Sequence, residues 1–358
     1  MARFHPLKIA AIRPETLEAV SVVFAVPPEL QSEFAFAPGQ YLTLRGNSAG
    51  QDIRRCYSIC SAADDGELRV AIKKVSDGRF SAFANDHWKA GDVVEVMTPE
   101  GRFIAPTASA HKRRYVAFAA GSGITPILSL ARTLLMREPA SHFQLFYGNR
   151  SVDTIMFREA LEDLKNSFMT RFAVTHILSR EKQDFDLFNG RLDGAKIEQL
   201  AGKLFDPTGV DLFFLCGPGS LIEEVSGALA KLGVERERIK FELFATPEQP
   251  ARPLARTAQA AKREGTAQVT VIRDGVRHHF PVAFDGEAIL DAGIRQGVDL
   301  PFSCKGGVCS TCRCKARLGQ VEMDKNYALE PWELDAGFVL ACQSHPLSDE
   351  VVLDFDEA

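Results

Sequence analysis

The stretch Pro301-Phe302-Ser303-Cys304-Lys305-Gly306-Gly307-Val308-Cys309-Ser310-Thr311-Cys312 sets three cysteines at C-x4-C-x2-C spacing, and Cys342 follows after twenty-nine further residues. Soft thiolates select iron–sulfur centres or zinc, and four thiolates at this spacing suit a two-iron, two-sulfur (2Fe-2S) cluster. Gly306 and Gly307 let the backbone wrap closely and turn its N–H groups toward the sulfurs. The sequence therefore predicts a 2Fe-2S cluster whose ligands are Cys304, Cys309, Cys312 and Cys342.

Zinc and disulfide bonds are the alternatives for these cysteines. Structural zinc sites usually carry two C-x2-C pairs, whereas here the first gap is four residues and the last cysteine stands alone. Disulfides form in oxidising compartments, and nothing in the sequence indicates one. Cys314 is a fifth thiol in the same region, and we expect it to pack beside the ligands rather than to bind metal.

The residues around the cysteines resemble the plant-type ferredoxins. Residues 287–294 and 299–304 are similar to the helix and loop that lead into the cluster of that family, and 338–343 is similar to the strand that carries the fourth ligand. A predicted hairpin opens the module, with the turn Arg273-Asp274-Gly275 between two strands. The resemblance covers 267–358 and implies an α+β, ferredoxin-like (β-grasp) domain there.

Length and composition allow a chain of two or three globular domains. The protein has 358 residues, of which 46% are hydrophobic and 25% are charged. There is no run of eighteen apolar residues and no signal peptide at the start, so we expect no membrane association and a cytoplasmic protein with reduced cysteines. Nothing resembles the basic footprint of a nucleic-acid-binding protein.

Charge is unevenly distributed along the chain, whose net charge is −5. Residues 267–358 hold eight basic and fifteen acidic residues, a balance of −7, while the rest of the chain has a balance of +2. An acidic redox module favours docking onto a basic patch of a partner, although acidic surfaces also simply keep a module soluble.

Residues 1–106 predict an antiparallel β-barrel, because short apolar strands alternate with turns rich in glycine, proline and aspartate. The expected strands are Leu7–Ile12, Ala19–Ala25, Tyr41–Arg45, Arg55–Cys60, Leu68–Lys74 and Val93–Met97.

Residues 111–244 predict an α/β domain with a parallel sheet, because apolar strands alternate with helices. The expected strands are Tyr115–Ala120, Phe143–Tyr147, Arg171–Leu178 and Leu212–Cys216, and the expected helices are Pro126–Arg137, Met156–Leu164, Gly194–Leu204 and Gly219–Leu232. Residues 245–266 have no hydrophobic period and three prolines, so we expect a linker there.

The barrel carries two motifs that resemble the flavin site of the ferredoxin–NADP reductase superfamily. Arg55-Cys56-Tyr57-Ser58 is similar to its R-x-Y-S motif, and Gly78-Arg79-Phe80-Ser81 to its G-x-x-S loop. The resemblance implies that Arg55 pairs with a pyrophosphate, Tyr57 stacks on the isoalloxazine, and Ser58 bonds its N5 edge. It also implies that Gly78 and Ser81 bind the pyrophosphate at a helix start. FAD is the expected flavin. FMN, used by the related phthalate-type reductases, is the alternative, and R-x-Y-S alone also suits an ordinary barrel strand.

The α/β domain carries the motifs of a nicotinamide site in the same superfamily. Gly121-Ser122-Gly123-Ile124-Thr125-Pro126 is similar to its G-x-G-x-x-P turn, so Gly121, Gly123 and Thr125 are expected to bind the nucleotide. Cys216-Gly217 is similar to the segment that lies near the reactive nicotinamide carbon, with Cys216 as a neutral thiol. Glu242 stands where relatives place a glutamate near the flavin, where it either assists proton movement or is structural.

Ser179-Arg180, after the strand that ends at Leu178, stands where NADPH users of the superfamily hold the 2′-phosphate. Arginine binds a phosphate dianion well. The pair therefore favours NADPH over NADH, and the alternative is a surface arginine followed by Glu181.

Together these parts predict an enzyme that takes a hydride from NADPH onto FAD and passes single electrons through the cluster, near roughly −400 mV, to an external acceptor. The domain order resembles the reductases of the phenylacetyl-CoA epoxidase family and, more distantly, the steroid 9α-hydroxylase reductases. The resemblance implies a multi-subunit di-iron oxygenase as partner, with a role in phenylacetate and other aromatic catabolism. The alternatives are an NADH-dependent reductase of another oxygenase, a non-catalytic redox sensor, and a zinc-stabilised C-terminal module.

Overall fold

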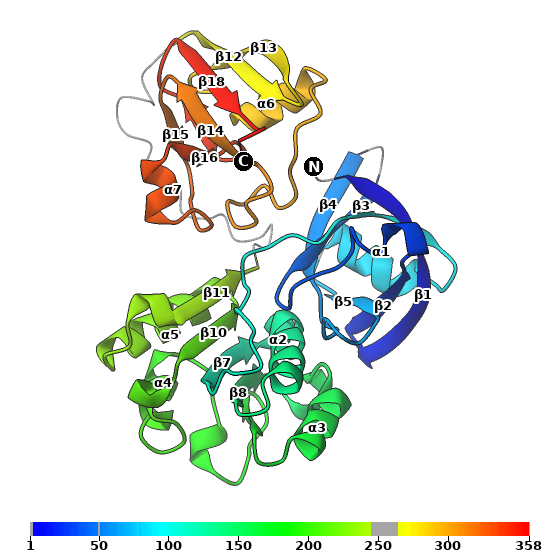
Figure 1. The fold of residues 1–358 in the computed structure, drawn as a ribbon, viewed down its shortest axis with the longest axis vertical. Helices are drawn as coiled ribbons and strands as arrows, with labels where there is room; N and C mark the ends of the chain where they lie inside the picture. The colour runs from blue at the N-terminus through cyan, green and yellow to red at the C-terminus, as the bar shows by residue number, and fades with distance from the viewer. Residues whose placement is uncertain (1–2, 49–50, 77, 245–263, 358) are drawn as a thin grey trace. The chain divides into compact units, whose positions relative to one another are not determined.

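The computed structural model describes residues 3–48, 51–76, 78–244 and 264–357. The chain forms two compact units, Met1–Phe244 and Ala245–Ala358 (Figure 1). Each unit has its own hydrophobic core. None of the described helices is long and apolar enough to cross a membrane.

The first part of the chain forms a six-stranded antiparallel sheet with the order β4-β3-β6-β1-β2-β5. Its strands are β1 (Phe4–Thr16), β2 (Ala19–Ala25), β3 (Tyr41–Ser48), β4 (Gln51–Ser58), β5 (Leu68–Lys73) and β6 (Val93–Met97), and helix α1 (Arg79–His87) follows β5. A bridge between Ile59 and Val70 joins the two outer strands. This closes the sheet into the expected barrel around an aliphatic core.

The predicted strands at β2 and β6 are confirmed at both of their bounds, whereas the prediction of Arg55–Cys60 is wrong at both ends. Strand β4 begins at Gln51. It ends at Ser58 because the neighbouring strand of the chain changes there from β3 to β5. The N–H of Ile59 donates to the carbonyl of Gln40, directly before β3, at 2.9 Å and Ile59 also forms a bridge with Val70 of β5, and the N–H of Cys60 then donates to the carbonyl of Arg69 at 2.8 Å. Ser58 therefore lies at the corner where the strand leaves one neighbour for the other.

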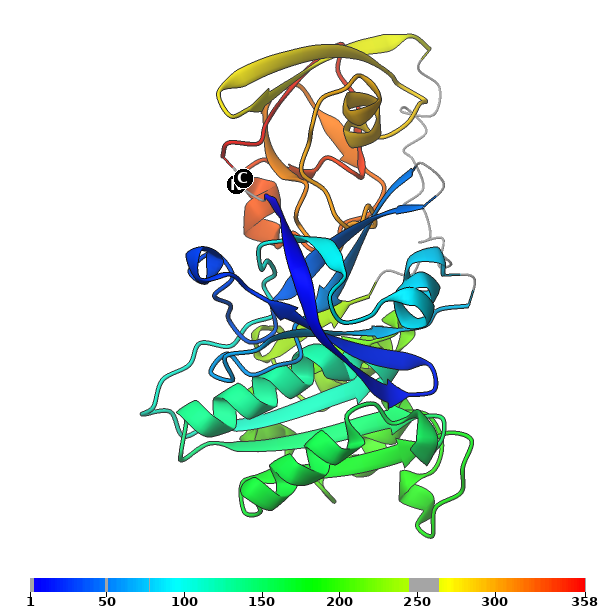
Figure 2. The same cartoon turned by 90° about the vertical axis from the view of Figure 1, so that its right-hand side faces the viewer.

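A five-stranded parallel sheet with the order β11-β10-β7-β8-β9 follows the barrel. Its strands are β7 (Arg114–Ala120), β8 (His142–Asn149), β9 (Phe172–Leu178), β10 (Leu212–Gly217) and β11 (Ile239–Leu243). Helices α2 (Ile124–Arg137) and α3 (Arg158–Ser167) cover one face, as Figure 2 shows, and α4 (Gly194–Leu200) and α5 (Gly219–Lys231) cover the other. The predicted parallel sheet with helices on both faces is confirmed.

Helix α2 is fastened to the barrel along its length. The buried hydroxyl of Ser129 donates to the carbonyl of Ser61 at 2.7 Å. Nearer the end of the helix, Arg137 donates two hydrogen bonds of 2.7 Å to Asp64, although an exposed pair of this kind stabilises little by itself. Because α2 begins directly after the Gly121–Gly123 turn, these contacts fix that turn relative to the barrel.

The second unit is a five-stranded mixed sheet with the order β13-β12-β18-β14-β16, beside the pair β15-β17. Its elements are β12 (Thr266–Arg273), β13 (Val276–Ala283), α6 (Ile289–Arg295), β14 (Arg313–Leu318), β15 (Val321–Met323), α7 (Pro331–Asp335), β16 (Phe338–Leu340), β17 (Ser344–Pro346) and β18 (Glu350–Asp354). The predicted hairpin is confirmed, and its central residues Asp274 and Gly275 both have positive φ, 53° and 72°, as a type I′ turn requires.

One boundary in this unit differs from the prediction. The strand expected over 338–343 ends at Leu340, and Cys342 lies in the turn that follows. The N–H of Gln343 donates to the carbonyl of Leu340 at 2.9 Å, which bends the chain out of the sheet before Cys342. The expected linker at 245–266 lies outside the described residues except for its last three, and the last of these, Thr266, begins β12.

Candidate flavin, nicotinamide and iron–sulfur sites

The R-x-Y-S residues occupy the end of β4. The ring of Tyr57 stacks on that of Phe80, with 5.9 Å between ring centroids and 29° between ring planes. Burial raises the pKa of the Tyr57 hydroxyl, so it stays neutral at physiological pH. Arg55 is exposed, and its Nη1 donates to the carbonyl of Arg54 at 2.8 Å. Tyr57 is thus held as a flat aromatic surface beside an exposed guanidinium.

The G-x-x-S residues form the turn that opens helix α1. Gly78 directly precedes the helix, and a Cβ there would lie 2.5 Å from Ser81 Oγ and 2.9 Å from the Val75 carbonyl oxygen. The Ser81 hydroxyl accepts from the N–H of Val75 at 3.1 Å and donates to the carbonyl of Gly78 at 3.2 Å. Ser81 therefore locks the turn from within. The N–H groups of the first turn have no partners inside the helix, which suits a phosphate.

Three predicted residues from distant parts of the chain meet at one point. The hydroxyl of Ser58 donates to Oε2 of Glu242 at 2.7 Å, although 184 residues separate them. Cys216, on β10, is the register partner of Glu242 on the parallel strand β11. The flavin motif of the barrel and the end of the nicotinamide domain are thus joined by a direct hydrogen bond.

The electrostatics of this point favour neutral groups. Burial raises the pKa of Glu242 to about 7, against the opposing effect of the hydrogen bond from Ser58. Burial also raises the pKa of the Cys216 thiol well above its usual value, and the charge of Glu242 adds to this. Cys216 therefore stays a thiol, while Glu242 titrates near physiological pH.

The glycine turn lies against β10 with no space for side chains. Gly121 has φ 54°, in the left-handed region, and it begins a short 3-10 helix, Gly121–Gly123. A Cβ on Gly123 would lie 2.1 Å from the carbonyl oxygen of Cys216, and a Cβ on Gly217 would lie 3.3 Å from the backbone nitrogen of Ala120. Glycine is therefore required where the turn crosses the ends of β7 and β10.

Side-chain hydrogen bonds hold the same turn from both sides. Thr125 Oγ1 donates to the carbonyl of Ser122 at 2.9 Å, and the hydroxyl of Tyr147 donates to the carbonyl of Gly121 at 2.8 Å. Thr125 is buried, and its hydroxyl is used in a hydrogen bond within the turn. The backbone of the turn is therefore the part that a nucleotide can contact. Pro126 lies in the first turn of α2, where its missing N–H costs nothing.

Ser179 and Arg180 follow β9 at the carboxyl edge of the sheet. The N–H of Ser179 donates to the carbonyl of Asn149 at 3.0 Å, and the N–H of Arg180 donates to the carbonyl of Arg150 at 2.8 Å. Both arginines are exposed, and their backbones are neighbours. The carboxylate of Glu181 accepts from the N–H of Val152 at 2.8 Å. The edge thus carries two exposed arginines on hydrogen-bonded backbone segments.

Two basic residues of this region were missed by sequence reasoning. Arg150 follows a buried strand, and because parallel strand ends meet at one edge, its proximity to Arg180 could have been predicted. Lys73 ends β5 in the barrel, and its Nζ lies 4.0 Å from the position of a Cβ on Gly121. Burial lowers the pKa of Lys73, and the charge of Arg150 lowers it further, whereas Glu18 raises it. No sequence signal links β5 to the glycine turn.

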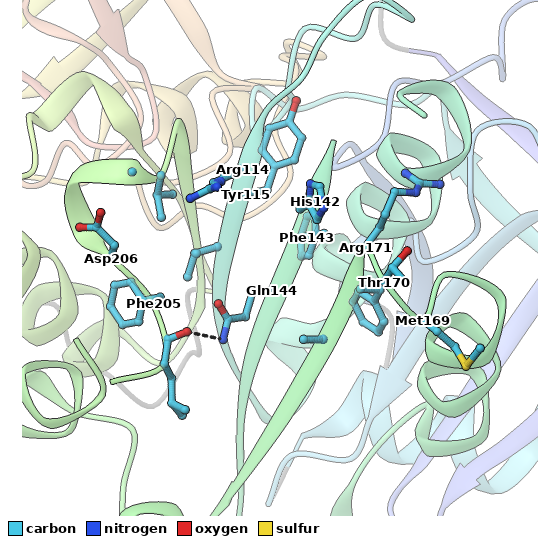
Figure 3. A pocket seen from close by; sticks show the side chains of 16 residues that line it. Arg114, Tyr115, His142, Phe143, Gln144, Met169, Thr170, Arg171, Phe205 and Asp206 are labelled. Carbon is cyan, nitrogen blue, oxygen red and sulfur yellow. Dashed lines mark hydrogen bonds between the residues drawn. The ribbon is translucent and has the colours of Figure 1, made fainter. Parts of the chain in front are cut away.

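A pocket of about 380 Å³ lies at the opposite edge of the parallel sheet (Figure 3). Residues at the starts of β7, β8 and β9 line it, among them Arg114, His142 and Phe172. Gln144 crosses it to donate to the carbonyl of Leu204 at 3.1 Å. It contains none of the predicted site residues. Ligands of open parallel sheets bind at the carboxyl ends of the strands, so this pocket is not the nucleotide site.

The four predicted cluster cysteines come together in two pairs. Side-chain hydrogen bonds join Cys304 to Cys309 and Cys312 to Cys342, and they raise the pKa of Cys304 and of Cys312 well above the usual value. In the described part of the chain no three His, Cys, Asp or Glu side chains have the geometry to close on a single metal ion. Two irons bridged by sulfide need two pairs of thiolates, so the paired arrangement fits a 2Fe-2S cluster.

The loop from Cys304 to Cys312, here called the cluster loop, has the backbone conformation that a 2Fe-2S cluster needs. Lys305, Gly307 and Ser310 have φ of 52°, 75° and 59°. The N–H of Gly306 donates to Sγ of Cys304 at 3.3 Å, so one amide has the expected direction toward the sulfur of a predicted ligand. A Cβ on Gly307 would lie 3.1 Å from the Lys325 carbonyl oxygen in addition to its positive φ, so glycine is needed there.

Cys314 lies on β14, fully buried, with its thiol 3.8 Å from the carbonyl oxygen of Val339. Burial raises the pKa of its thiol, which is the behaviour of a packed neutral side chain. It is not among the thiols that pair in the cluster loop.

Comparison with known proteins finds three domain models in order along the chain. Residues 15–104 match the model of the oxidoreductase FAD-binding domain, 118–227 that of the oxidoreductase NAD-binding domain, and 271–347 that of the 2Fe-2S iron-sulfur cluster binding domain. Phthalate dioxygenase reductase, a modular structure for electron transfer from pyridine nucleotides to [2Fe-2S], has a similar fold. The TM-score is 0.60 at 24% identity, and the alignment covers 98% of both chains.

The fold and these sites define an oxidoreductase that uses FAD, a nicotinamide nucleotide and a 2Fe-2S cluster for electron transfer. The chain is 44% identical over 357 residues to a subunit of the 1,2-phenylacetyl-CoA epoxidase of Escherichia coli, covering 99% of each protein. It is also 36% identical over 360 residues to the ferredoxin reductase component of 3-ketosteroid-9-alpha-monooxygenase from Mycobacterium tuberculosis, covering 98% of this chain and 96% of that one. The chain belongs to this family of oxygenase reductase components.

Proposed function

We propose that this protein is the NADPH-dependent reductase component of a multi-subunit di-iron epoxidase that acts on phenylacetyl-CoA. The observation that carries the proposal is the 44% identity to the E. coli epoxidase component over 99% of both chains. We also propose that the barrel spans 1–106, the nicotinamide domain 111–244, the linker 245–266 and the cluster domain 267–358. All eight cysteines are free of disulfide bonds, which supports a cytoplasmic location.

In the flavin site we assign roles to residues of the barrel. When bound, FAD would accept an electron pair as hydride and release electrons singly, and the cluster would supply one-electron transfer at about −400 mV. Arg55 and the N–H groups at the start of α1 bind the diphosphate, with Gly78 and Ser81 shaping the turn. Tyr57 supports the flavin ring, and Ser58 hydrogen-bonds its edge.

In the nicotinamide site the backbone does most of the binding. Gly121 and Gly123 let the nucleotide approach the ends of the strands, and Thr125 and Gly217 keep the turn in place. Cys216 supplies a neutral, unreactive surface that excludes water near the reacting carbon. Glu242 holds a proton on its carboxyl group below about pH 7 and accepts the Ser58 hydrogen bond above it.

The substitution Glu242→Gln is expected to remove a pH dependence of flavin reduction. Glu242 titrates near pH 7, and its carboxylate above that pH repels the negative charge that arrives with a hydride. The rate of flavin reduction in the wild type should therefore fall by about tenfold, or ~1.4 kcal/mol, as pH rises from about 6 to about 8.5. Glutamine, which is always neutral, should keep the faster rate throughout. Stopped-flow reduction by NADPH measures this, with Glu224→Gln on α5 as an exposed control; an unchanged pH profile in Glu242→Gln would contradict the role.

The substitution Arg180→Ala is expected to weaken the preference for NADPH. A guanidinium that pairs with the 2′-phosphate contributes affinity for NADPH and none for NADH. The KM for NADPH should rise by roughly tenfold while the KM for NADH stays within about twofold. Arg150→Ala should act in the same direction, and Arg158→Ala, on α3, serves as the control. Equal changes in the KM for NADPH and the KM for NADH would show that Arg180 does not bind the 2′-phosphate.

Reconstitution tests the proposal as a whole. The purified protein, with the oxygenase subunits of the epoxidase and phenylacetyl-CoA, should oxidise NADPH with coupled oxygen use and epoxide formation. Rapid reduction of flavin and cluster without product would retain the reductase chemistry and exclude this partner. Product formation with a 3-ketosteroid 9α-oxygenase instead would move the protein to the second group of relatives.

A further inference from the structure

The side chain of Gln343 lies between the two parts of the chain that carry the cluster ligands. It is 6% exposed. Its Nε2 lies 2.9 Å from the carbonyl oxygen of Lys305, in the loop with Cys304, Cys309 and Cys312. The same Nε2 lies 2.9 Å from the carbonyl oxygen of Cys342 and 3.5 Å from its Sγ. One buried amide group thus contacts both the cluster loop and the fourth ligand.

The backbone of Gln343 is fixed at both of its polar groups. Its N–H donates to the carbonyl of Leu340 at 2.9 Å, and its carbonyl accepts from the N–H of Asp324 at 2.9 Å. Its Cγ lies 3.3 Å from the position of a Cβ on Gly307, so the side chain packs against the cluster loop. The amide therefore has little freedom to turn away from the sulfur.

The contact with Lys305 holds a strained part of the loop. Lys305 has φ 52°, a left-handed conformation that is costly for a residue with a side chain. The bond from Gln343 to the carbonyl of Lys305 stabilises this conformation, and the next residue, Gly306, directs its N–H to Sγ of Cys304 at 3.3 Å. The amide has two N–H groups for three acceptors, so Gln343 acts on the Cys342 sulfur through a shared N–H and on the Cys304 sulfur through the loop.

We propose that Gln343 is a positioning residue that raises the reduction potential of the cluster. Reduction adds one negative charge, part of which resides on the sulfurs, and N–H groups directed at those sulfurs stabilise the charged form. In a buried site of low dielectric constant, this stabilisation is larger than in water. The proposal depends on Cys342 being a cluster ligand and does not depend on which oxygenase accepts the electrons.

The effect of substitution follows from the two contacts. Gln343→Leu keeps the approximate volume and removes the amide, so the cluster should become harder to reduce. Its one-electron reduction equilibrium should shift by about tenfold, equivalent to ~59 mV toward lower potential. Gln343→Glu places an acceptor with a negative charge beside the sulfur and should shift the potential further in the same direction.

The experiment is a redox titration of the full-length protein with its flavin and cluster bound, followed by cluster absorbance and by electron paramagnetic resonance of the reduced state. Gln296→Leu, an exposed glutamine at the end of α6 in the same unit, is the matched control and should have the wild-type potential. Gln343→Asn keeps the amide but shortens its reach, and it should give a shift in the same direction as Gln343→Leu.

Potentials equal to wild type in the cluster-containing Gln343 variants would overturn the proposal. Loss of the cluster from all three Gln343 variants would also overturn it, because Gln343 would then only hold the loop together. Flavin reduction by NADPH, measured on the same samples, should be unchanged in every variant. That measurement separates failure of this proposal from failure of the reductase function.

Discussion

Cys342→Ala is expected to abolish the visible absorbance of the cluster while the flavin is still reduced by NADPH. Cys342 is the thiol that pairs with Cys312, so if both bind one iron, its removal would leave that iron with a single protein ligand. Loss of hydrogen-bonding partners around a metal site costs about 10–100-fold in affinity, and loss of a ligand should cost more. Iron and acid-labile sulfide analysis measures the loss, and stopped-flow absorbance measures flavin reduction.

Cys314→Ala is the matched control for that substitution. The Cys314 thiol is buried on β14 beside the Val339 carbonyl and is a member of neither thiol pair, so the cluster should be retained. A full complement of iron and sulfide in Cys342→Ala would show that another residue is the fourth ligand. Zinc without sulfide in the wild-type protein would instead show a zinc-stabilised module.

Gly123→Ala is expected to slow the reduction of the flavin by NADPH by roughly 100-fold, the cost of a misplacement of about 1 Å between reacting groups. The added Cβ would lie 2.1 Å from the Cys216 carbonyl oxygen and 2.5 Å from its carbonyl carbon. Both are backbone atoms of β10, which lies between β11 and β7 in the sheet, so the glycine turn must move and would carry a bound nicotinamide away from the flavin. Stopped-flow kinetics with NADPH measure the effect.

Two comparisons make the result specific to hydride transfer. Gly227→Ala, on the exposed face of α5, adds a Cβ with no atom within 4 Å, and it should leave the rate unchanged. In Gly123→Ala, FAD and cluster content and reduction of the flavin by dithionite should match the wild type if the protein is folded. A wild-type rate with NADPH in a folded Gly123→Ala protein would show that the turn does not position the nicotinamide.

The sequence predicted those parts of the fold that are determined by local pattern. The apolar strands of the parallel sheet and the cluster cysteines follow from periodicity and spacing, and Asp274-Gly275 from turn chemistry. Both Ser58 and Glu242 were predicted as site residues, but their hydrogen bond was not. That contact depends on how a barrel strand meets the end of β11, which no local signal encodes.

The two wrong strand boundaries and the missed Lys73 also depend on contacts between distant parts of the chain. The strand expected to continue to Cys60 ends at Ser58 because β5 offers a different partner, and the strand expected to reach Gln343 ends at Leu340 because the chain turns toward the cluster loop. Lys73 reaches the glycine turn only because the barrel and the sheet are joined. Each of these features depends on residues far apart in the sequence.

The contacts between α2 and the barrel have a consequence for the evolution of this enzyme. In a helix each backbone N–H bonds the carbonyl four residues earlier, so a displacement of one turn also moves the turns next to it. Ser129, whose hydroxyl donates to the Ser61 carbonyl, lies on α2, and the glycine turn directly precedes that helix. Substitutions of the α2 residues that contact the barrel can therefore change the position of the glycine turn without contacting the coenzyme. Turnover can therefore adapt to temperature or to a new nucleotide through substitutions where α2 contacts the barrel, while the residues of the flavin and nicotinamide sites stay the same.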